Sequence, residues 1–176
     1  NSGFNKREFG GEMGTSVLDL KKGAEELFKD FSESRRNGIK KALRQNKLQI
    51  SEVETEAELA ELHEIHKSWC QRKGNEPDTF EQMKFGYSQK DYRKIFIAKL
   101  EGKVIAGSYY RFCKGGILEY AGNNSYLEHQ KLKPNELIMW RAVEWACGQD
   151  FQFFSLGGSH PFLRRFGGDV ASTYRY

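Results

Sequence analysis

Residues 117–156 read ILEYAGNNSYLEHQKLKPNELIMWRAVEWACGQDFQFFSL, and this stretch decides the fold. The apolar runs at 117–122 and 151–156 are typical of strands, whereas residues 134–147 have the pattern of a helix. Polar residues in the later part of that helix share a narrow wedge, so the helix must be largely buried. A strand, a buried helix and a second strand form a βαβ unit, which predicts a parallel pair of strands.

The rest of the chain indicates an α+β order, with helices first and strands later. Thr55 and Glu58 form a capping box, and apolar residues then recur at helical spacing until Gly74 ends the pattern. Short glycine turns join the later strands into an antiparallel meander. The expected strands are 15–20, 95–100, 104–112, 117–122, 151–156 and 170–176, and the expected helices are 24–31, 34–47, 55–74, 78–88 (capped by Asp78), 134–147 and a short one starting at Pro161.

Length and composition restrict the class of protein. A chain of 176 residues fits one domain, and no segment is long and apolar enough to cross a bilayer. The net charge of +4 is too small to indicate a nucleic-acid-binding protein by itself. Residues 1–14 are rich in glycine and charge and are expected to form a loop or tail. The chain does not begin with Met, which predicts that the natural protein extends upstream.

The densest charge signal lies in the expected helix 34–47. It contains six cations and no acid between Ser34 and Ser51. Four of them project within about a quarter-turn of one another, so they form a one-sign stripe suited to phosphates. The alternative is a solvated helix face. The six cations are Arg35, Arg36, Lys40, Lys41, Arg44 and Lys47.

Two glycine pairs are candidates for close backbone approach to a ligand. Gly157 and Gly158 join a strand to a helix start, where free N–H groups can hold an anion or a carbonyl oxygen. Gly167 and Gly168 precede the last strand in the same way. The spacing is neither that of a P-loop nor that of a dinucleotide fingerprint, and plain turns are the alternative in both places.

The histidines and cysteines give no strong chemical signal. His63 and His66 are three residues apart on a helix, a spacing that metal sites use, but no third ligand accompanies them. We therefore expect a pair at the edge of the core and no metal. Cys70, Cys113 and Cys147 have no sequence-visible base beside them and are interpreted as packing residues.

Five short motifs, in order and with matching intervals over about residues 15–176, resemble one family. The resemblance is to the second half of the Fem-type peptidoglycan bridge-forming aminoacyltransferases and to their GNAT-fold relatives. The motifs are Ser34-Arg35-Arg36-Asn37-Gly38-Ile39-Lys40-Lys41-Ala42, Tyr120-Ala121-Gly122-Asn123-Asn124-Ser125, Pro134-Asn135-Glu136-Leu137-Ile138-Met139-Trp140, Phe154-Ser155-Leu156-Gly157-Gly158 and Arg165-Phe166-Gly167-Gly168.

The resemblance implies a GNAT-like (acyl-CoA N-acyltransferase) fold, a mixed and splayed sheet flanked by helices. Fem-type proteins usually carry two such domains and move an amino acid from aminoacyl-tRNA to an amine of a cell-wall precursor. Residues 15–176 are then expected to be the C-terminal domain, with a missing N-terminal domain as partner. The reaction implies the cytoplasm, at the inner face of the membrane, and no cofactor beyond the aminoacyl-tRNA co-substrate.

The chain departs from the family pattern in the loop that precedes helix 134–147. GNAT domains that bind coenzyme A place a glycine-rich loop there, whereas residues 126–135 contain no glycine. Acyl-CoA is therefore the less expected donor, although Lys131 and Lys133 are placed to contact phosphate. Acyl-CoA-dependent N-acyl transfer in polysaccharide or envelope biosynthesis remains the alternative.

Two further departures concern the expected site. Fem-type proteins often have an aspartate where this chain has Ser155, and a lysine where it has Leu163. Arg164 or Arg165 is then the candidate for the missing cation.

Attack by an amine on an ester requires a deprotonated nucleophile, a stabilised oxyanion and correct placement of the two substrates. Backbone N–H groups near Ala106-Gly107 or Gly122-Asn123 are candidates for holding the oxyanion. The candidate catalytic residues are Glu119, Tyr120, Asn123 and Ser155, and the candidate substrate- or phosphate-binding residues are Arg35, Arg36, Lys40, Arg44, Tyr126, Gly157, Gly158, Arg164 and Arg165.

Three hypotheses follow for the whole chain. The first is an acyl- or aminoacyltransferase whose groove, opened by residues 117–156, is overlooked by the basic helix. The second is a non-catalytic GNAT-like module that binds a nucleotide-bearing partner. The third is a structural half whose basic helix faces the missing domain.

Overall fold

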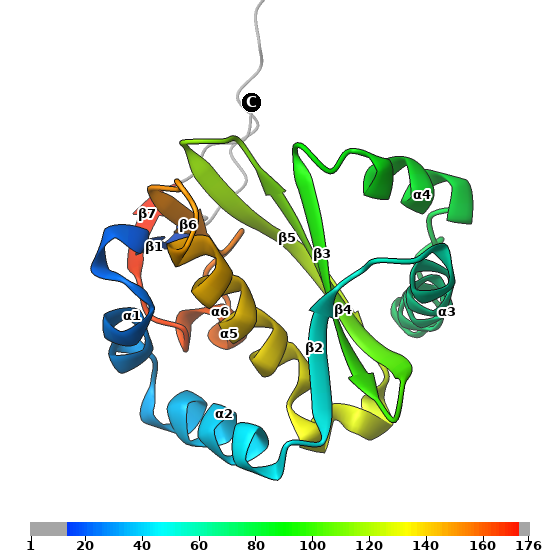
Figure 1. Ribbon diagram of the computed structural model, residues 1–176, viewed down its shortest axis with the longest axis horizontal. Coiled ribbons are helices and arrows are strands. Elements are labelled where there is room, and N and C mark those ends of the chain that lie inside the picture. Colours follow the sequence, from blue (N-terminus) through cyan, green and yellow to red (C-terminus); the bar gives the residue numbers. More distant parts are fainter. Residues whose placement is uncertain (1–13, 173–176) are drawn as a thin grey trace, which may run out of the picture.

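The computed structural model describes residues 14–172, which form one seven-stranded mixed sheet with helices on both faces (Figure 1). The strand order is β2-β3-β4-β5-β6-β1-β7. The strands are β1 (Gly14–Asp19), β2 (Leu48–Glu52), β3 (Arg93–Leu100), β4 (Lys103–Phe112), β5 (Ile117–Ser125), β6 (Phe153–Ser155) and β7 (Asp169–Ser172). The α-helices are α1 (Ala24–Asp30), α2 (Glu33–Gln45), α3 (Glu56–Lys73), α4 (Phe80–Ser88), α5 (Pro134–Cys147) and α6 (Pro161–Arg164), and 3₁₀ helices span Leu20–Lys22 and Leu127–Leu132.

The predicted βαβ unit is confirmed. β5 and β6 are parallel neighbours, paired from Ile117↔Phe153 to Glu119↔Ser155, and α5 connects them. Beyond Glu119, β5 continues to Ser125 while β6 ends, so the two strands separate. The sheet is therefore mixed and splayed, as expected for an α+β fold of this class.

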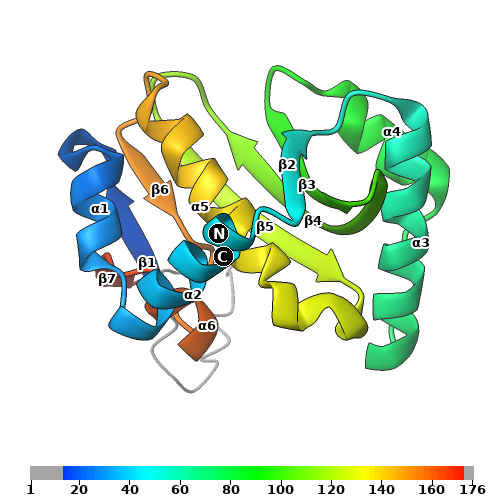
Figure 2. The same ribbon diagram turned by 60° about the horizontal axis from the view of Figure 1, so that its bottom comes forward.

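The sheet separates two apolar cores (Figure 2). The larger core lies on the α5 side, where α1 and α2 also pack, and the smaller one lies beneath α3 and α4. Helix α5 explains the larger core, because seven of its residues are buried and its polar positions are few, as the sequence predicted. They are Pro134, Leu137, Ile138, Met139, Ala142, Val143 and Ala146.

The predicted helix boundaries agree best with the structure where the sequence contains a capping residue. The capping box of Thr55 and Glu58 is present, and Gly74 ends α3 in the left-handed conformation. The expected cap of α4 is wrong by one residue, since Thr79 and Gln82 form a second capping box after Asp78.

Three elements were missed and one was placed only in part. The strand β2 was not expected, because its polar residues hide the alternation, and neither were the 3₁₀ helices Leu20–Lys22 and Leu127–Leu132. The last strand covers Asp169–Ser172, and the predicted remainder at 173–176 lies outside the described residues. The expected tail at 1–14 likewise lies almost wholly outside them. No helix within residues 14–172 combines the length and the apolarity needed to span a bilayer.

Candidate active site

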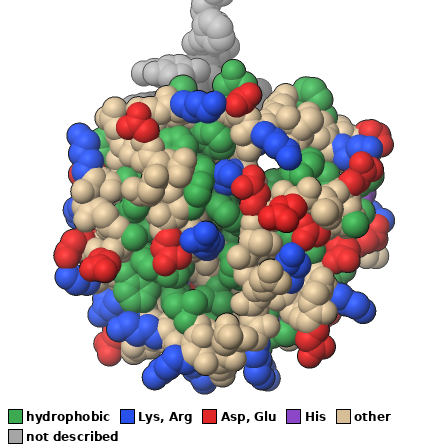
Figure 3. All heavy atoms as spheres, viewed as in Figure 1, with side chains coloured by type: hydrophobic (Ala, Val, Ile, Leu, Met, Phe, Trp, Pro, Cys, Tyr) green, Lys and Arg blue, Asp and Glu red, His purple; other side chains and the backbone are tan. Residues whose placement is uncertain are grey.

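A cavity of about 550 Å³ lies between the sheet and helices α3 and α4. Its floor is formed by β3, β4 and β5, on the face opposite α5, and Figure 3 shows a hollow on this side of the molecule with Lys or Arg side chains at its rim. The cavity extends to His160, in the segment between β6 and α6. It therefore connects the space beneath α4 with the splayed region of the sheet.

A β-bulge shapes the cavity floor. Tyr109 of β4 is opposite Gly122, but the next residue, Tyr110, is opposite Tyr120, so Ala121 is the extra residue of β5. A bulge interrupts the ladder of hydrogen bonds and turns backbone groups out of it. Ala121, Gly122 and Asn123 line the cavity, which puts the predicted oxyanion position at 122–123 on its wall.

The other predicted oxyanion position, at Ala106-Gly107, is covered by helix α3. Gly107 lies under α3, where a Cβ would come within 2.6 Å of a methyl group of Leu62. The glycine thus allows α3 to approach the sheet closely, which is a packing role. A bulge does occur beside Ala106, between β3 and β4, but neither Ala106 nor Gly107 lines the cavity.

A buried polar network borders the cavity on the α3 side. The Tyr109 hydroxyl donates to Asn124 Oδ1 over 2.9 Å, and His66 Nδ1 lies 3.2 Å from the same oxygen. His66 Nε2 accepts the backbone N–H of Asp78, so Nδ1 carries the proton that Asn124 accepts. Burial raises the pKa of Tyr109, which therefore remains a protonated donor.

His63 takes part in the same arrangement. Its Nε2 lies 2.8 Å from the carbonyl oxygen of Asp78, so the two histidines bind both sides of one backbone residue in the α3–α4 loop. Within residues 14–172 no group of three or more His, Cys, Asp or Glu side chains is placed to hold a metal ion. The role of the pair is to position the loop that closes the cavity.

The four candidate catalytic residues separate into two groups, one that lines the cavity and one that does not. Tyr120 and Asn123 line the cavity, and burial raises the pKa of Tyr120, so its hydroxyl is a proton donor. Glu119 does not line the cavity, but it pairs at 3.0 Å with Arg111, which does. Ser155 does not line the cavity and its hydroxyl lies 3.2 Å from that of Thr15 on the neighbouring strand β1.

Arg35 does not belong to the exposed stripe of cations that the sequence predicted for this helix. It is buried, its guanidinium pairs with Glu136 at 2.8 Å, and it donates to the carbonyl oxygen of Phe162. The rings of Phe162 and Phe166 flank it at 4.5 and 4.4 Å. Arg35 therefore joins α2, α5 and α6 and does not present its charge to phosphate.

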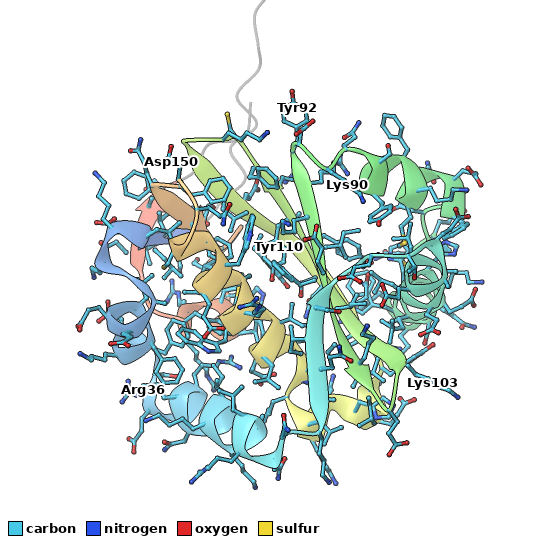
Figure 4. All side chains as sticks on the ribbon, viewed as in Figure 1. Arg36, Lys90, Tyr92, Lys103, Tyr110 and Asp150 are labelled. Carbon is cyan, nitrogen blue, oxygen red and sulfur yellow. The ribbon has the colours of Figure 1, made fainter. Side chains whose placement is uncertain are left out.

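The prediction that the basic helix overlooks the groove is also wrong. Helix α2 packs against α5, whereas the cavity is on the α3–α4 side of the sheet, and no α2 residue lines it. Figure 4 shows the separation: Arg36 is at the α2 corner, far from Lys90 and Tyr92 at the end of α4. Arg36 itself donates to backbone carbonyls of Lys29 and Phe31. Lys40, Lys41, Arg44 and Lys47 remain exposed.

The remaining predicted binding residues surround the splayed end of the sheet. Gly157 has a φ of 70°, and a Cβ there would overlap the carbonyl oxygen of Tyr120, so this turn lies directly against the bulged strand. Gly158 accepts a hydrogen bond from the backbone N–H of Ser16 through its carbonyl. Tyr126 packs against the smaller core and does not line the cavity.

The departures at 163–165 have a structural explanation. Leu163 is buried, so the position where Fem-type proteins tend to have a lysine is part of the apolar core here. Arg164 and Arg165 are exposed. The charge of Arg165 acts on Arg35, which places both near the N-terminal end of α5.

A mixed sheet that splays at a parallel strand pair, with a bulged strand facing a cavity, defines an acyltransferase-type domain. The chain belongs to the GNAT acetyltransferase domain family, whose model matches residues 29–169. No protein sequence among the curated proteins matches it.

Solved structures with the same fold agree with this assignment at low sequence identity. FemX has a TM-score of 0.79 and 12% identity, covering 98% of this chain and 62% of that one. The C-terminal domain of a putative lysylphosphatidylglycerol synthetase from Agrobacterium fabrum has a TM-score of 0.67 and 10% identity, covering 91% and 58%. A Bacteroides thetaiotaomicron protein of unknown function has a TM-score of 0.63 and 11% identity, covering 89% and 56%. The chain thus spans about three fifths of each.

Proposed function

We propose that the protein transfers an aminoacyl group from aminoacyl-tRNA to an amine of a cell-wall (peptidoglycan) precursor. The observation that carries the proposal is the bulge at Ala121, which places backbone groups of the splayed strand β5 on the wall of a cavity lined by both polar and apolar side chains. The Fem-type motif order and the fold shared with FemX support the choice of donor and acceptor. A second structure with this fold is named for a lysyl-lipid product, which supports aminoacyl transfer more generally.

The proposed reaction needs little covalent chemistry from the protein. The amine nitrogen attacks the ester carbonyl carbon, a C–N bond forms, and the C–O bond to the tRNA ribose breaks. The proton lost by the amine ends on the departing ribose oxygen, so atoms and charge balance. Donors at the bulge stabilise the oxyanion, and the protonated hydroxyl of Tyr120 is a candidate donor to the leaving oxygen.

The region before α5 fits coenzyme A poorly. The connection contains a 3₁₀ helix that ends at Lys133 in the left-handed conformation, in place of a glycine loop. Pro134, the first residue of α5, supplies no N–H group to a pyrophosphate. The exposed cations of α2 are better placed for a long polyanion such as tRNA that reaches beyond the cavity.

Acyl-CoA-dependent N-acylation is the second candidate, since the family description is that of an acetyltransferase. A non-catalytic binding module, or a structural half that faces an N-terminal domain, is the remaining hypothesis. Aminoacyl-tRNA as donor further suggests the cytoplasm, at the inner face of the membrane.

The test uses the complete natural protein that contains these residues. Labelled amino acid is offered on charged tRNA, or labelled acetyl groups on acetyl-CoA, together with amine-bearing cell-wall precursors. The proposal expects product from tRNA and not from acetyl-CoA, and a loss of at least tenfold in Asn124→Ala, because Tyr109 and His66 lose their shared acceptor. Gln71→Ala, an exposed change on α3 at a position that does not line the cavity, is the matched control. Transfer from acetyl-CoA alone favours the second candidate, and no transfer from either donor rejects the enzyme.

Charge reversal on α2 tests the donor separately. Lys40→Glu with Arg44→Glu is expected to weaken tRNA binding and to remove part of its salt dependence, while acceptor binding stays unchanged. If tRNA binding is unaffected, the exposed face of α2 is a solvated surface.

A further inference from the structure

Two arginines lie side by side at the edge of the cavity. Arg93 begins β3 and Arg111 is near the end of β4, and the two are direct partners across the antiparallel pair. They share the face of the sheet that bears Ile95 and Tyr109, and both line the cavity. Like charges directly opposite one another on adjacent strands destabilise a sheet, so this pair requires an explanation.

An internal carboxylate compensates one of the two cations. Arg111 pairs with Glu119 on β5, so β3, β4 and β5 contribute two positive charges and one negative charge in a row. Within residues 14–172, the Arg93 guanidinium has no ion pair and no hydrogen bond to another residue. The row therefore has an excess of one positive charge at the edge of the cavity.

Neighbouring acids do not supply the missing partner. Asp91, two residues before Arg93, pairs with Lys114 at 3.1 Å. Asp78 lines the cavity, but its carboxylate lies 3.8 Å from His66 Nε2, on the α3 side. Glu52 on the neighbouring strand β2 is already paired, since it accepts a hydrogen bond from the ammonium group of Lys94.

The position of the Arg93 guanidinium depends on a glycine of α4. A Cβ at Gly86 would lie 3.1 Å from Arg93 Nη1, so the side chain lies closely against the helix backbone at this point. An alanine at 86 would require the guanidinium to move by a few tenths of an ångström. Gly86 also lines the cavity, so the helix and the arginine border the same space.

We propose that the arginine pair binds a carboxylate of the acceptor, so that the acceptor is an amino acid or short peptide with a free carboxyl group. This inference rests on the proposed function, because it takes the cavity as the acceptor site. A planar guanidinium binds a carboxylate through two parallel hydrogen bonds, and a cavity of about 550 Å³ accommodates a peptide of a few residues. The carboxylate on Arg93 anchors the acceptor at the edge of the cavity, and its amine reaches inward toward the bulge at Ala121.

A matched pair of probes tests the proposal without requiring transfer. The tripeptide Ala-Lys-Ala is titrated, as the free acid and as the C-terminal amide, against the complete protein, and binding is followed by NMR shifts of the protein. The free acid is expected to bind at least tenfold more tightly than the amide. Arg93→Gln should abolish that preference, and Arg93→Lys should retain only part of it, because a lysine keeps the charge but not the planar fork.

Two further variants separate position from charge. Gly86→Ala is expected to reduce the preference for the free acid, because the new Cβ displaces the guanidinium. Lys90→Gln removes a nearby cation that does not line the cavity and that pairs with no acid among the described residues, and it should keep the full preference. A competition with inorganic phosphate distinguishes a carboxylate site from a general anion site, which would bind phosphate equally well.

Three results would overturn the inference: equal binding of acid and amide, binding of neither, or a preference that survives in Arg93→Gln. Failure of the proposed function has a different signature. A protein that keeps the carboxylate preference but transfers nothing from charged tRNA or acetyl-CoA has the site without the reaction.

Discussion

Arg35 and Arg93 lie on opposite sides of one sheet and show two different uses of the same residue. Arg35 is buried on the α5 side, paired with Glu136 and enclosed by two phenylalanine rings. Arg93 is exposed on the α3–α4 side, opposite another arginine and without an acid partner among the described residues. The α5 face satisfies its charges internally, whereas the cavity face leaves one for a ligand. Each of the following experiments tests part of this difference.

The largest effect is expected on the α5 face. Glu136→Ala leaves the Arg35 guanidinium buried without its counter-ion, which typically costs about 3–5 kcal/mol of unfolding free energy. Urea unfolding at pH 7 measures the loss. Glu33→Ala, an exposed acid in the first turn of α2, is the control and should cost less than about 0.5 kcal/mol. A loss below about 1 kcal/mol in Glu136→Ala would mean that Arg35 finds another partner or water.

The next effect concerns the turn at Gly157, which follows β6 and lies against β5 where the two strands separate. Gly157→Ala places a methyl group against the Tyr120 carbonyl at a φ of 70°, and it should destabilise the protein by about 2 kcal/mol or more. Gly102→Ala is the matched control, because its φ is also positive, at 82°, but nothing lies within 4 Å of the new methyl. It should cost about 1 kcal/mol. Equal losses in the two variants would show that the contact with Tyr120 is unimportant.

Much of the α5 face is predictable from the sequence because its signals are local. The narrow polar wedge of helix 134–147 indicates burial, and the flanking apolar runs indicate the parallel strands that β5 and β6 form. The burial of Arg35 was missed, although a signal exists: Arg35, Ile39 and Ala42 are spaced by four and three residues, and all three are buried on one face of α2. The stronger sequence signal on α2 is the density of cations, and most of these lie on its exposed face.

The cavity face depends on contacts between distant residues, which local patterns do not reveal. His66, Tyr109 and Asn124 come from a helix and two strands, and nothing in their spacing brings them together. The opposition of Arg93 and Arg111 depends on the bulge between β3 and β4. Pairing counted outward from the turn at Glu101-Gly102 would put Arg93 opposite Tyr110, because a bulge shifts the register by one residue.

A smaller effect with a clear pH dependence is expected in the first turn of α3, on the same side of the sheet as the cavity. Burial acts to raise the pKa of Glu58, but hydrogen bonds from Lys99 and from two backbone N–H groups outweigh it, and the pKa lies below its usual value of 4.5. A lowered folded-state pKa stabilises the protein above the unfolded value, and that stabilisation disappears as the pH falls through the folded value. Glu58→Gln keeps the capping-box geometry and should cost about 0.5 kcal/mol at pH 7. In urea unfolding the difference from wild type should shrink as the pH falls below 4.5 and through the folded-state pKa, and a constant difference would assign the effect to packing.

The smallest effect, and the one that best separates the two arginines, is expected for Arg93→Gln. If Arg93 is held for a ligand, its removal costs the unliganded protein nothing and relieves repulsion from Arg111, so unfolding free energy should stay equal or rise by up to about 0.5 kcal/mol. Because that gain is electrostatic between exposed groups, unfolding curves in about 1 M NaCl should show it reduced. A loss of about 1 kcal/mol or more would reveal an internal partner and would make Arg93 a structural residue like Arg35. Unchanged stability together with lost carboxylate preference is the combination that a binding role requires and a structural role does not produce.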